Sequence, residues 1–224
     1  MTQGNIVKQV LLFALPLMLG NVFQMLYNTV DSVVVGQFVS TQALAAVGTT
    51  GPLVNIFNGF FTGLGSGATV ILAQFYGAGN KQGVRDTLHT GVTLSLLLGL
   101  LIMVLGIGLG PVALQWMHTP ADCLDMASLY VRVYFAGALA SMLYNMEAGI
   151  LRAMGDSQRP VISLIVACVV NIIMDIVLVV FLKMGVAGAA LATVISQIVS
   201  AAMLLFVLLR ERENPLNLRC LGLD

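Results

Sequence analysis

Long apolar stretches alternate along the chain with short segments rich in polar residues, glycine and proline. A hydrocarbon core about 30 Å thick requires about 20 helical residues, so we interpret six of these stretches as membrane-spanning helices. The expected spans are residues 10–36, 41–76, 91–114, 124–150, 161–182 and 186–209. The fourth is the least apolar, because it carries Asp125, Arg132 and Glu147. The pattern predicts an all-α integral membrane protein, with a six-helix bundle over residues 1–209 and a tail or linker over residues 210–224.

Basic residues are unevenly distributed between the predicted loops. An even number of spans places both chain ends on one side, and eight of the ten Lys and Arg residues fall there, whereas only Arg132 and Lys183 fall on the other. Since cytoplasmic loops carry an excess of Lys and Arg, we expect both ends of the chain to lie in the cytoplasm. For a bacterial protein this means the inner membrane, and the first span is read as uncleaved because it is too long and too polar for a signal peptide.

Composition narrows the class of protein. The chain is 58% hydrophobic and 9% charged, against about 25% charged residues in soluble domains, which excludes a water-soluble fold. Ten basic residues balance ten acidic ones, so no net field favours nucleic acid. The three cysteines lie far apart, without a CxxC pair or nearby histidine, and indicate neither a disulfide framework nor a zinc site.

Polar residues inside the spans recur at helical spacing. Asn21, Gln24, Asn28 and Asp31 fall within an arc of about 80° at 100° per residue. Similar stripes occur on four other spans: Asn55, Asn58, Thr62, Ser66 and Thr69; Tyr130, Tyr134, Ser141 and Asn145; Asn171 and Asp175; and Thr193, Ser196, Gln197 and Ser200. The third span has almost none. Five polar faces suggest a bundle around a wet cavity, although such residues can also serve only as interhelical hydrogen bonds, each contributing about 0.6 kcal/mol.

Two aspartates within the spans carry the functional prediction. An acid inside a membrane costs on the order of 3 kcal/mol or more and marks an ion or proton pathway. At 1.5 Å per residue, Asp31, Asp175 and Thr193 each lie about 10 Å below the expected outer surface. Neighbouring carboxylates repel when both are ionised, so such a pair either takes up a proton or gathers oxygen ligands around a hard cation such as Na⁺. Pro16, within the first span, is expected to act as a hinge because proline removes a backbone hydrogen bond.

Several segments together resemble the multidrug and toxic compound extrusion (MATE) family over essentially the whole chain. They are Leu15-Pro-Leu-Met-Leu-Gly-Asn21, Tyr27-Asn-Thr-Val-Asp-Ser32, Ala43-Leu-Ala-Ala-Val-Gly48, Ala73-Gln-Phe-Tyr-Gly-Ala-Gly79, Leu151-Arg-Ala-Met-Gly-Asp156, Asn171-Ile-Ile-Met-Asp175 and Gly188-Ala-Ala-Leu-Ala-Thr-Val-Ile-Ser-Gln197. Each segment is weak alone, but their shared order is specific.

The resemblance implies one lobe of a transporter with two six-helix lobes, which exports amphipathic organic cations in exchange for H⁺ or Na⁺. By position, Asp31, Asn171, Asp175 and Thr193 look like the family's cation site, which could hold Na⁺, and Pro16 like its helix bend. Further candidates lining the substrate cavity are Gln24, Tyr27, Asn28 and Asn145. No cofactor besides the coupling ion is expected. The expected partners are the lipid bilayer, the organic cation and a second six-helix lobe, either a missing C-terminal lobe or a second copy.

Three alternatives remain open at this point. A lipid-linked oligosaccharide flippase of the same superfamily would favour a cavity rich in Arg and Lys, whereas Arg132 and Lys183 are expected near the outer surface. A membrane-embedded enzyme is disfavoured, because the chain has no HExxH, DDxxD or GxSxG motif and His89 and His118 lie at span ends. A truncated lobe could also act only as a non-transporting assembly partner.

Overall fold

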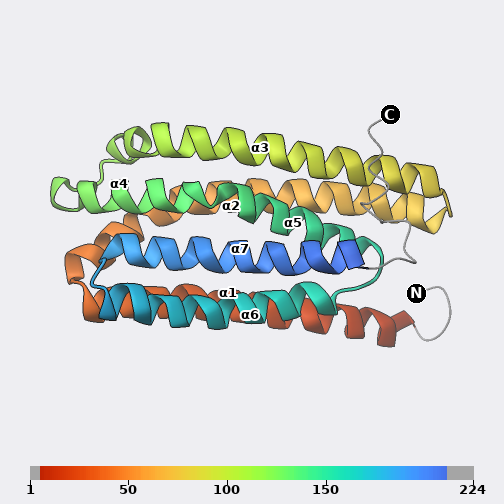
Figure 1. Cartoon of the computed structure of the whole chain (residues 1–224), viewed down its shortest axis with the longest axis horizontal. Coiled ribbons are helices and arrows are strands. Elements are labelled where there is room, and N and C mark those ends of the chain that lie inside the picture. The colour runs from red at the N-terminus through yellow and green to blue at the C-terminus, as the bar shows by residue number, and fades with distance from the viewer. Residues whose placement is uncertain (1–5, 211–224) are drawn as a thin grey trace.

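The computed structural model describes residues 6–210, and within this range the chain forms helices joined by short turns (Figure 1). In chain order the helices are α1 (Ile6–Phe38), α2 (Thr41–Gly77), α3 (Lys81–Trp116), α4 (Ala121–Ala136), α5 (Ala138–Ala153), α6 (Gln158–Asp175), the π-helix η1 (Ile176–Phe181) and α7 (Val186–Arg210). The start of α1 and the end of α7 lie at the same end of the bundle, as an even number of crossings requires. The predicted tail lies outside the described residues, apart from Arg210.

The turns use residues suited to reversing the chain. Gly79, Gly155 and Gly185 each have a positive φ, which glycine adopts without steric cost. Ser40 and Asn80 cap the next helices, because their side-chain oxygens accept hydrogen bonds from Ala43 N and Gly83 N, both at 3.0 Å. Because Asn80 caps α3, this helix begins ten residues before the predicted span over residues 91–114. The first turns of α3 are therefore helical although they are polar.

The predicted fourth span is not one straight helix. The chain forms α4 and α5, which meet at Gly137 with a bend of 47°. A Cβ at Gly137 would lie only 2.7 Å from Val194 of α7, so the absence of a side chain allows α7 to pack against the bend. The apolar pattern did not reveal this break, because the residues on both sides of Gly137 favour helix.

The predicted fifth span also changes form along its length. It is an α-helix up to Asp175 and a π-helix over Ile176–Phe181. Single-turn π segments inside helices are rare and occur frequently at functional sites. The change of helix type therefore directly follows one of the two aspartates identified from the sequence.

Among the described residues, four helical segments are long and apolar enough to cross a membrane, namely α2, α3, α6 with η1, and α7. The bent pair α4 and α5 forms a fifth if it is counted as one broken span. This search covers only the described residues, and the crossing of the membrane by α1 stays a prediction. Its described part carries Asn21, Gln24, Asn28 and Asp31, which lower its apolar character.

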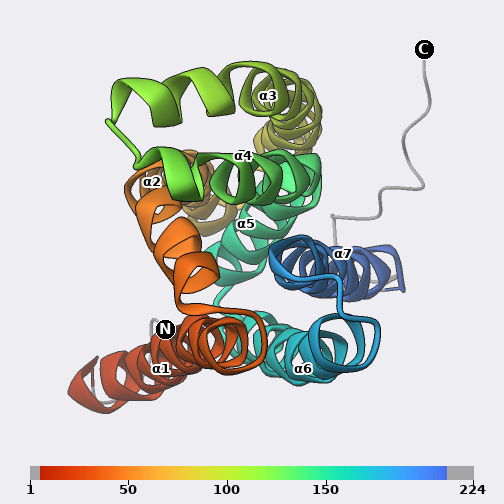
Figure 2. The ribbon, with the colours of Figure 1, turned by 90° about the vertical axis from the view of Figure 1, so that its left-hand side faces the viewer.

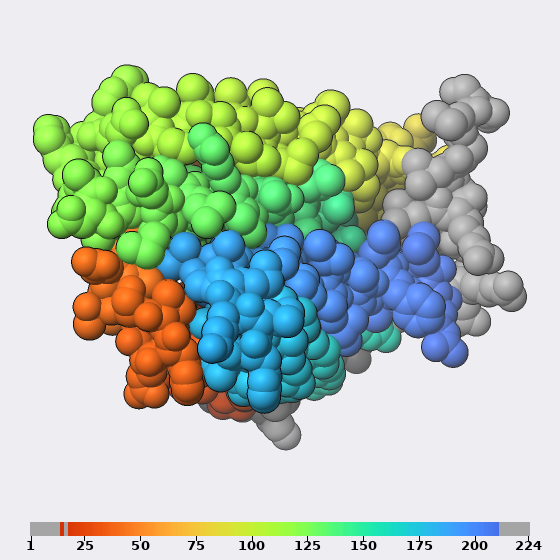
Figure 3. Space-filling view, turned by 60° about the vertical axis from the view of Figure 1, so that its left-hand side comes forward, coloured from red at the N-terminus to blue at the C-terminus, as the bar shows by residue number. Residues whose placement is uncertain are grey.

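The helices pack with α5 against α2 and α3, and with α6 between α1 and α7 (Figure 2). The space-filling view shows α7 in direct contact with α4 beside it (Figure 3). Helix α3, which lacks a polar stripe, exposes a row of large apolar side chains that includes Leu97, Val104 and Leu109. This surface suits contact with lipid chains, and the polar faces of the other helices turn inward or toward one open side.

Candidate cation site and polar cavities

The four residues predicted to couple transport to a cation lie together. Asp31 comes from α1, Asn171 and Asp175 from α6, and Thr193 from α7. Thr193 Oγ1 donates a hydrogen bond to Asp31 Oδ2 at 3.1 Å, and the Asp31 carboxyl neighbours the side chains of Asp175 and Asn171. The matching depths inferred from the sequence thus correspond to a shared layer in the bundle. The packing of α1, α6 and α7 brings the four side chains together in this layer.

These side chains are shielded from solvent. Asn171 and Asp175 are 0% exposed, Thr193 is 5% exposed and Asp31 is 7% exposed. Among the described residues, Asp31 Oδ1, both carboxyl oxygens of Asp175 and the side-chain amide of Asn171 have no hydrogen-bond partner. Buried polar atoms are nearly always hydrogen-bonded. A cluster of carboxyl, amide and hydroxyl oxygens has the chemistry to share a proton or to coordinate a hard cation.

A cleft of about 280 Å³, here called the outer cleft, opens onto this cluster from α1, α2, α4 and α7. Asp31 and Thr193 line it, as do the predicted cavity residues Gln24, Tyr27 and Asn28. Asn171 and Asp175 do not line it among the described residues. Asp31 is therefore the acid that faces the cleft, and Asp175 lies behind it in the protein interior.

Two tyrosines of the outer cleft were not among the predicted site residues. Tyr130 and Tyr134 lie one turn apart on α4, with ring centroids 6.2 Å apart and planes at 16°. Tyr134 Oη donates a hydrogen bond to Asn58 Oδ1 at 3.2 Å, which ties α4 to α2. Aromatic faces attract organic cations. The signal in the sequence was the four-residue spacing of the two tyrosines on a span with a polar stripe.

Asn145 lies elsewhere. Its Nδ2 donates to Ser141 O at 2.8 Å, and it lines a second cavity of about 310 Å³, here called the inner cavity, between α1, α2, α5, α6 and α7. Gln24, Asn58 and Gln197 line both cavities. Asn145 therefore lines a cavity that it shares with Gln24 and not with Tyr27 or Asn28, and its role in substrate binding stays a prediction.

Pro16 and Glu147 are the remaining residues that were singled out from the sequence. Pro16 lies inside the continuous helix α1, and its hinge role stays a prediction. Glu147 is buried, and its Oε2 has no hydrogen-bond partner. Within the described part of the chain, no ion pair joins Glu147 to Arg152.

A third, more open hollow of about 690 Å³ follows the seam between α1 and α2. It is lined mainly by polar side chains, among them Asn21, Asn28, Asn55 and Thr62. These four residues are exposed. A polar, exposed helix face is unsuited to lipid chains, so this side of the bundle is the one expected to meet water or a second polar surface.

Together, the long apolar helices, the buried acid pair and the polar cavities define an integral membrane protein built around a hydrophilic interior. The MatE family model matches residues 16–177, and the chain therefore belongs to the MatE family. A probable multidrug resistance protein of Bacillus subtilis, YoeA, is 35% identical over 220 residues, covering 96% of this chain and 47% of the relative.

Solved structures support the same assignment. A MATE protein crystallised in a bent conformation has a TM-score of 0.89 to this chain at 30% identity, covering 96% of this chain and 48% of that chain. A multidrug resistance MATE family transporter of the MOP superfamily, solved in an outward-facing conformation, also has a TM-score of 0.89 to this chain. It is 29% identical, and the match covers 96% of this chain and 47% of that chain. The chain spans about half the length of the relatives it matches, as expected for one lobe.

Proposed function

We propose that the chain forms one lobe of a secondary active antiporter that exports amphipathic organic cations in exchange for H⁺ or Na⁺. The observation that carries the proposal is the buried layer in which Thr193 bonds Asp31 beside Asp175 and Asn171. Binding of a proton or a sodium ion would neutralise part of the negative charge of the acid pair. Because Asp31 faces the outer cleft, its charge can change the affinity of that cleft for a cationic substrate.

The outer cleft has the chemistry expected of such a substrate site. Its polar lining and the tyrosine pair on α4 combine hydrogen-bond acceptors with aromatic faces, and none of the described residues that line it is Lys or Arg. A flippase for phosphate-containing lipids would be better served by basic residues there, so the lining favours an organic cation.

The exposed polar seam between α1 and α2 supports a second lobe as partner. In the assembled transporter this seam would face the second lobe across a central cavity, with both chain ends in the cytoplasm. Sizing the purified chain in detergent tests whether two copies can provide both lobes. A strict monomer would instead favour the reading in which the chain alone is a non-transporting assembly partner.

The coupling role is tested by replacing one acid at a time in the two-lobe transporter that contains this chain. Asp31→Asn and Asp175→Asn should each abolish ion-driven export of a fluorescent cation such as ethidium from liposomes. Asp125→Asn, an exposed acid on α4, is the matched control and should transport normally. Full export with unchanged pH and Na⁺ dependence in either buried-site variant would overturn the assignment.

A further inference from the structure

The inner cavity contains one charged residue in an otherwise neutral polar lining. Amide and hydroxyl side chains, among them Asn21, Thr62 and Asn145, line this cavity together with Arg152. Arg152 belongs to the last turn of α5, at the opposite end of the bundle from the layer that contains Asp31. No acidic residue lines this cavity among the described residues. The charge of the inner cavity is therefore opposite in sign to that of the outer cleft.

The Nε atom of Arg152 has no hydrogen-bond partner among the described residues, whereas the side chain as a whole is half-buried. This Nε–H group is buried and donates to no acceptor, and the ion pairs of the described residues do not include Arg152. Glu147 lies five residues earlier on α5, about 140° around the helix, and does not line the inner cavity. A buried donor that lacks a partner carries a desolvation cost, so the Nε–H of this arginine is suited to an external acceptor.

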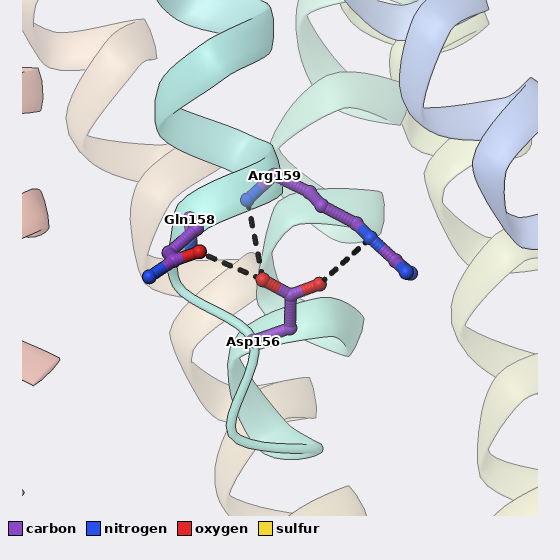
Figure 4. Close-up of polar contacts among 3 residues, drawn as sticks. All are labelled: Asp156, Gln158 and Arg159. Carbon is purple, nitrogen blue, oxygen red and sulfur yellow. Dashed lines mark hydrogen bonds and ion pairs between the residues drawn. The ribbon is translucent and has the colours of Figure 1, made fainter.

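Two acceptors that follow α5 in the chain already have hydrogen-bond partners. Asp156 Oδ1 accepts from Gln158 N at 3.0 Å and from Arg159 N at 3.2 Å, and its Oδ2 pairs with Arg159 Nε at 3.1 Å (Figure 4). Asp156 therefore caps α6 and pairs with Arg159. The carbonyl of Pro160, on the cavity wall, accepts from Tyr144 Oη at 3.3 Å and from Ser163 Oγ at 2.8 Å.

We propose that the inner cavity is an oxyanion site in which Arg152 binds a phosphate group. The planar guanidinium presents paired N–H donors that match two oxygens of a phosphate, and the neighbouring Asn and Gln amides supply further donors. The phosphate belongs either to an anionic lipid headgroup or to a water-soluble phosphate. The site uses none of Asp31, Asn171, Asp175 and Thr193, and it does not depend on the proposed antiport.

Chemical protection of Arg152 tests the proposal on the unmodified sequence. The 224-residue chain is placed in dodecylmaltoside, which carries no phosphate, and treated with phenylglyoxal, and modification of each arginine is followed by peptide mass spectrometry. Inorganic phosphate is added in one arm, and phosphatidylglycerol is added in the other. At a ligand concentration about ten times Kd, modification of Arg152 should slow about tenfold, since the free fraction is 1/(1 + [L]/Kd).

Arg132, exposed on α4, is the internal control and should react at the same rate throughout. Protection by inorganic phosphate assigns the site to a soluble ligand, and protection only by phosphatidylglycerol assigns it to a lipid headgroup. Equal reactivity of Arg152 in all conditions would overturn the proposal.

A second measurement uses variants of the same residue. Calorimetric titration with inorganic phosphate, or with short-chain phosphatidylglycerol if only lipid protects, should give no binding for Arg152→Gln and weakened binding for Arg152→Lys. The matched variant Arg132→Gln should bind as the original chain does. Unchanged affinity in Arg152→Gln would show that another group holds the anion. If Arg152→Gln does not fold, the protection experiment alone decides the proposal.

Discussion

The seam between α2 and α5 offers a sharp test of how closely this bundle is packed. A Cβ added at Gly149 would lie 2.7 Å from the carbonyl oxygen of Gly65 and 2.7 Å from Thr69 Oγ1. Ordinary contact begins at 3.4 Å, so Gly149→Ala requires the two helices to separate by about 0.7 Å. Thr69 cannot move aside freely, because its hydroxyl donates a 2.7 Å hydrogen bond to Gly65 O. Close approach through small residues is the usual packing device of membrane helices.

The magnitude follows from two opposing effects. Overpacking costs about 1–3 kcal/mol, whereas replacing glycine by alanine within a helix gains about 1 kcal/mol in helix propensity. Gly67→Ala on α2 isolates the second effect, because a Cβ there meets nothing within 4 Å. We therefore expect Gly149→Ala to be less stable than Gly67→Ala by about 1–3 kcal/mol.

The free energies of unfolding can be compared by reversible unfolding in mixed dodecylmaltoside and dodecylsulfate micelles, followed by circular dichroism. The unmodified chain provides the reference for both variants. A difference below about 0.5 kcal/mol between Gly149→Ala and Gly67→Ala, the scatter of ordinary surface substitutions, would refute the close contact of α2 and α5 at this point.

Two further outcomes are expected. Thr193→Val, which removes the donor to Asp31, should lower the free energy of unfolding by about 0.6 kcal/mol. Thr62→Val is its control, because the Thr62 hydroxyl bonds only to Asn58 O of its own helix, and equal losses in the two variants would contradict the interhelical role. Cys123 and Cys168 are buried free thiols, so peptide-resolved maleimide labelling in nanodiscs should be slow until detergent unfolds the chain. Rapid labelling of either in the folded chain would contradict its burial.

The sequence pattern was sufficient for the class of fold and for the expectation that Asp31, Asp175 and Thr193 lie in one layer. Each predicted span corresponds to one helix or to two consecutive helices, because helix formation in a membrane depends on local apolar character and length. The depth of Asp31, Asp175 and Thr193 could be estimated from their distance to the span ends, since the rise per residue of a helix is constant. The coupling role of these residues still depends on transport measurements.

Helical periodicity also singled out the third span as the one that has almost no polar stripe. Helix α3 has no polar stripe and exposes its apolar side chains, whereas the stripes of α1, α2, α4 and α7 contribute to the outer cleft. The spacing of polar residues assigns them to a face of their own helix. It does not state which neighbouring helix that face will meet.

The sequence by itself therefore determined a helical membrane protein with two acids at matching depth, because span length, depth and helix face are local properties. Only the tertiary structure decided that Gly137 bends the fourth span, that Asp31 faces the cleft while Asp175 lies behind it, and that Asn145 and Arg152 belong to a separate cavity. These features depend on how α7 packs against Gly137 and how α1 and α6 approach each other. Contacts between residues distant in the chain have no periodic signal along it.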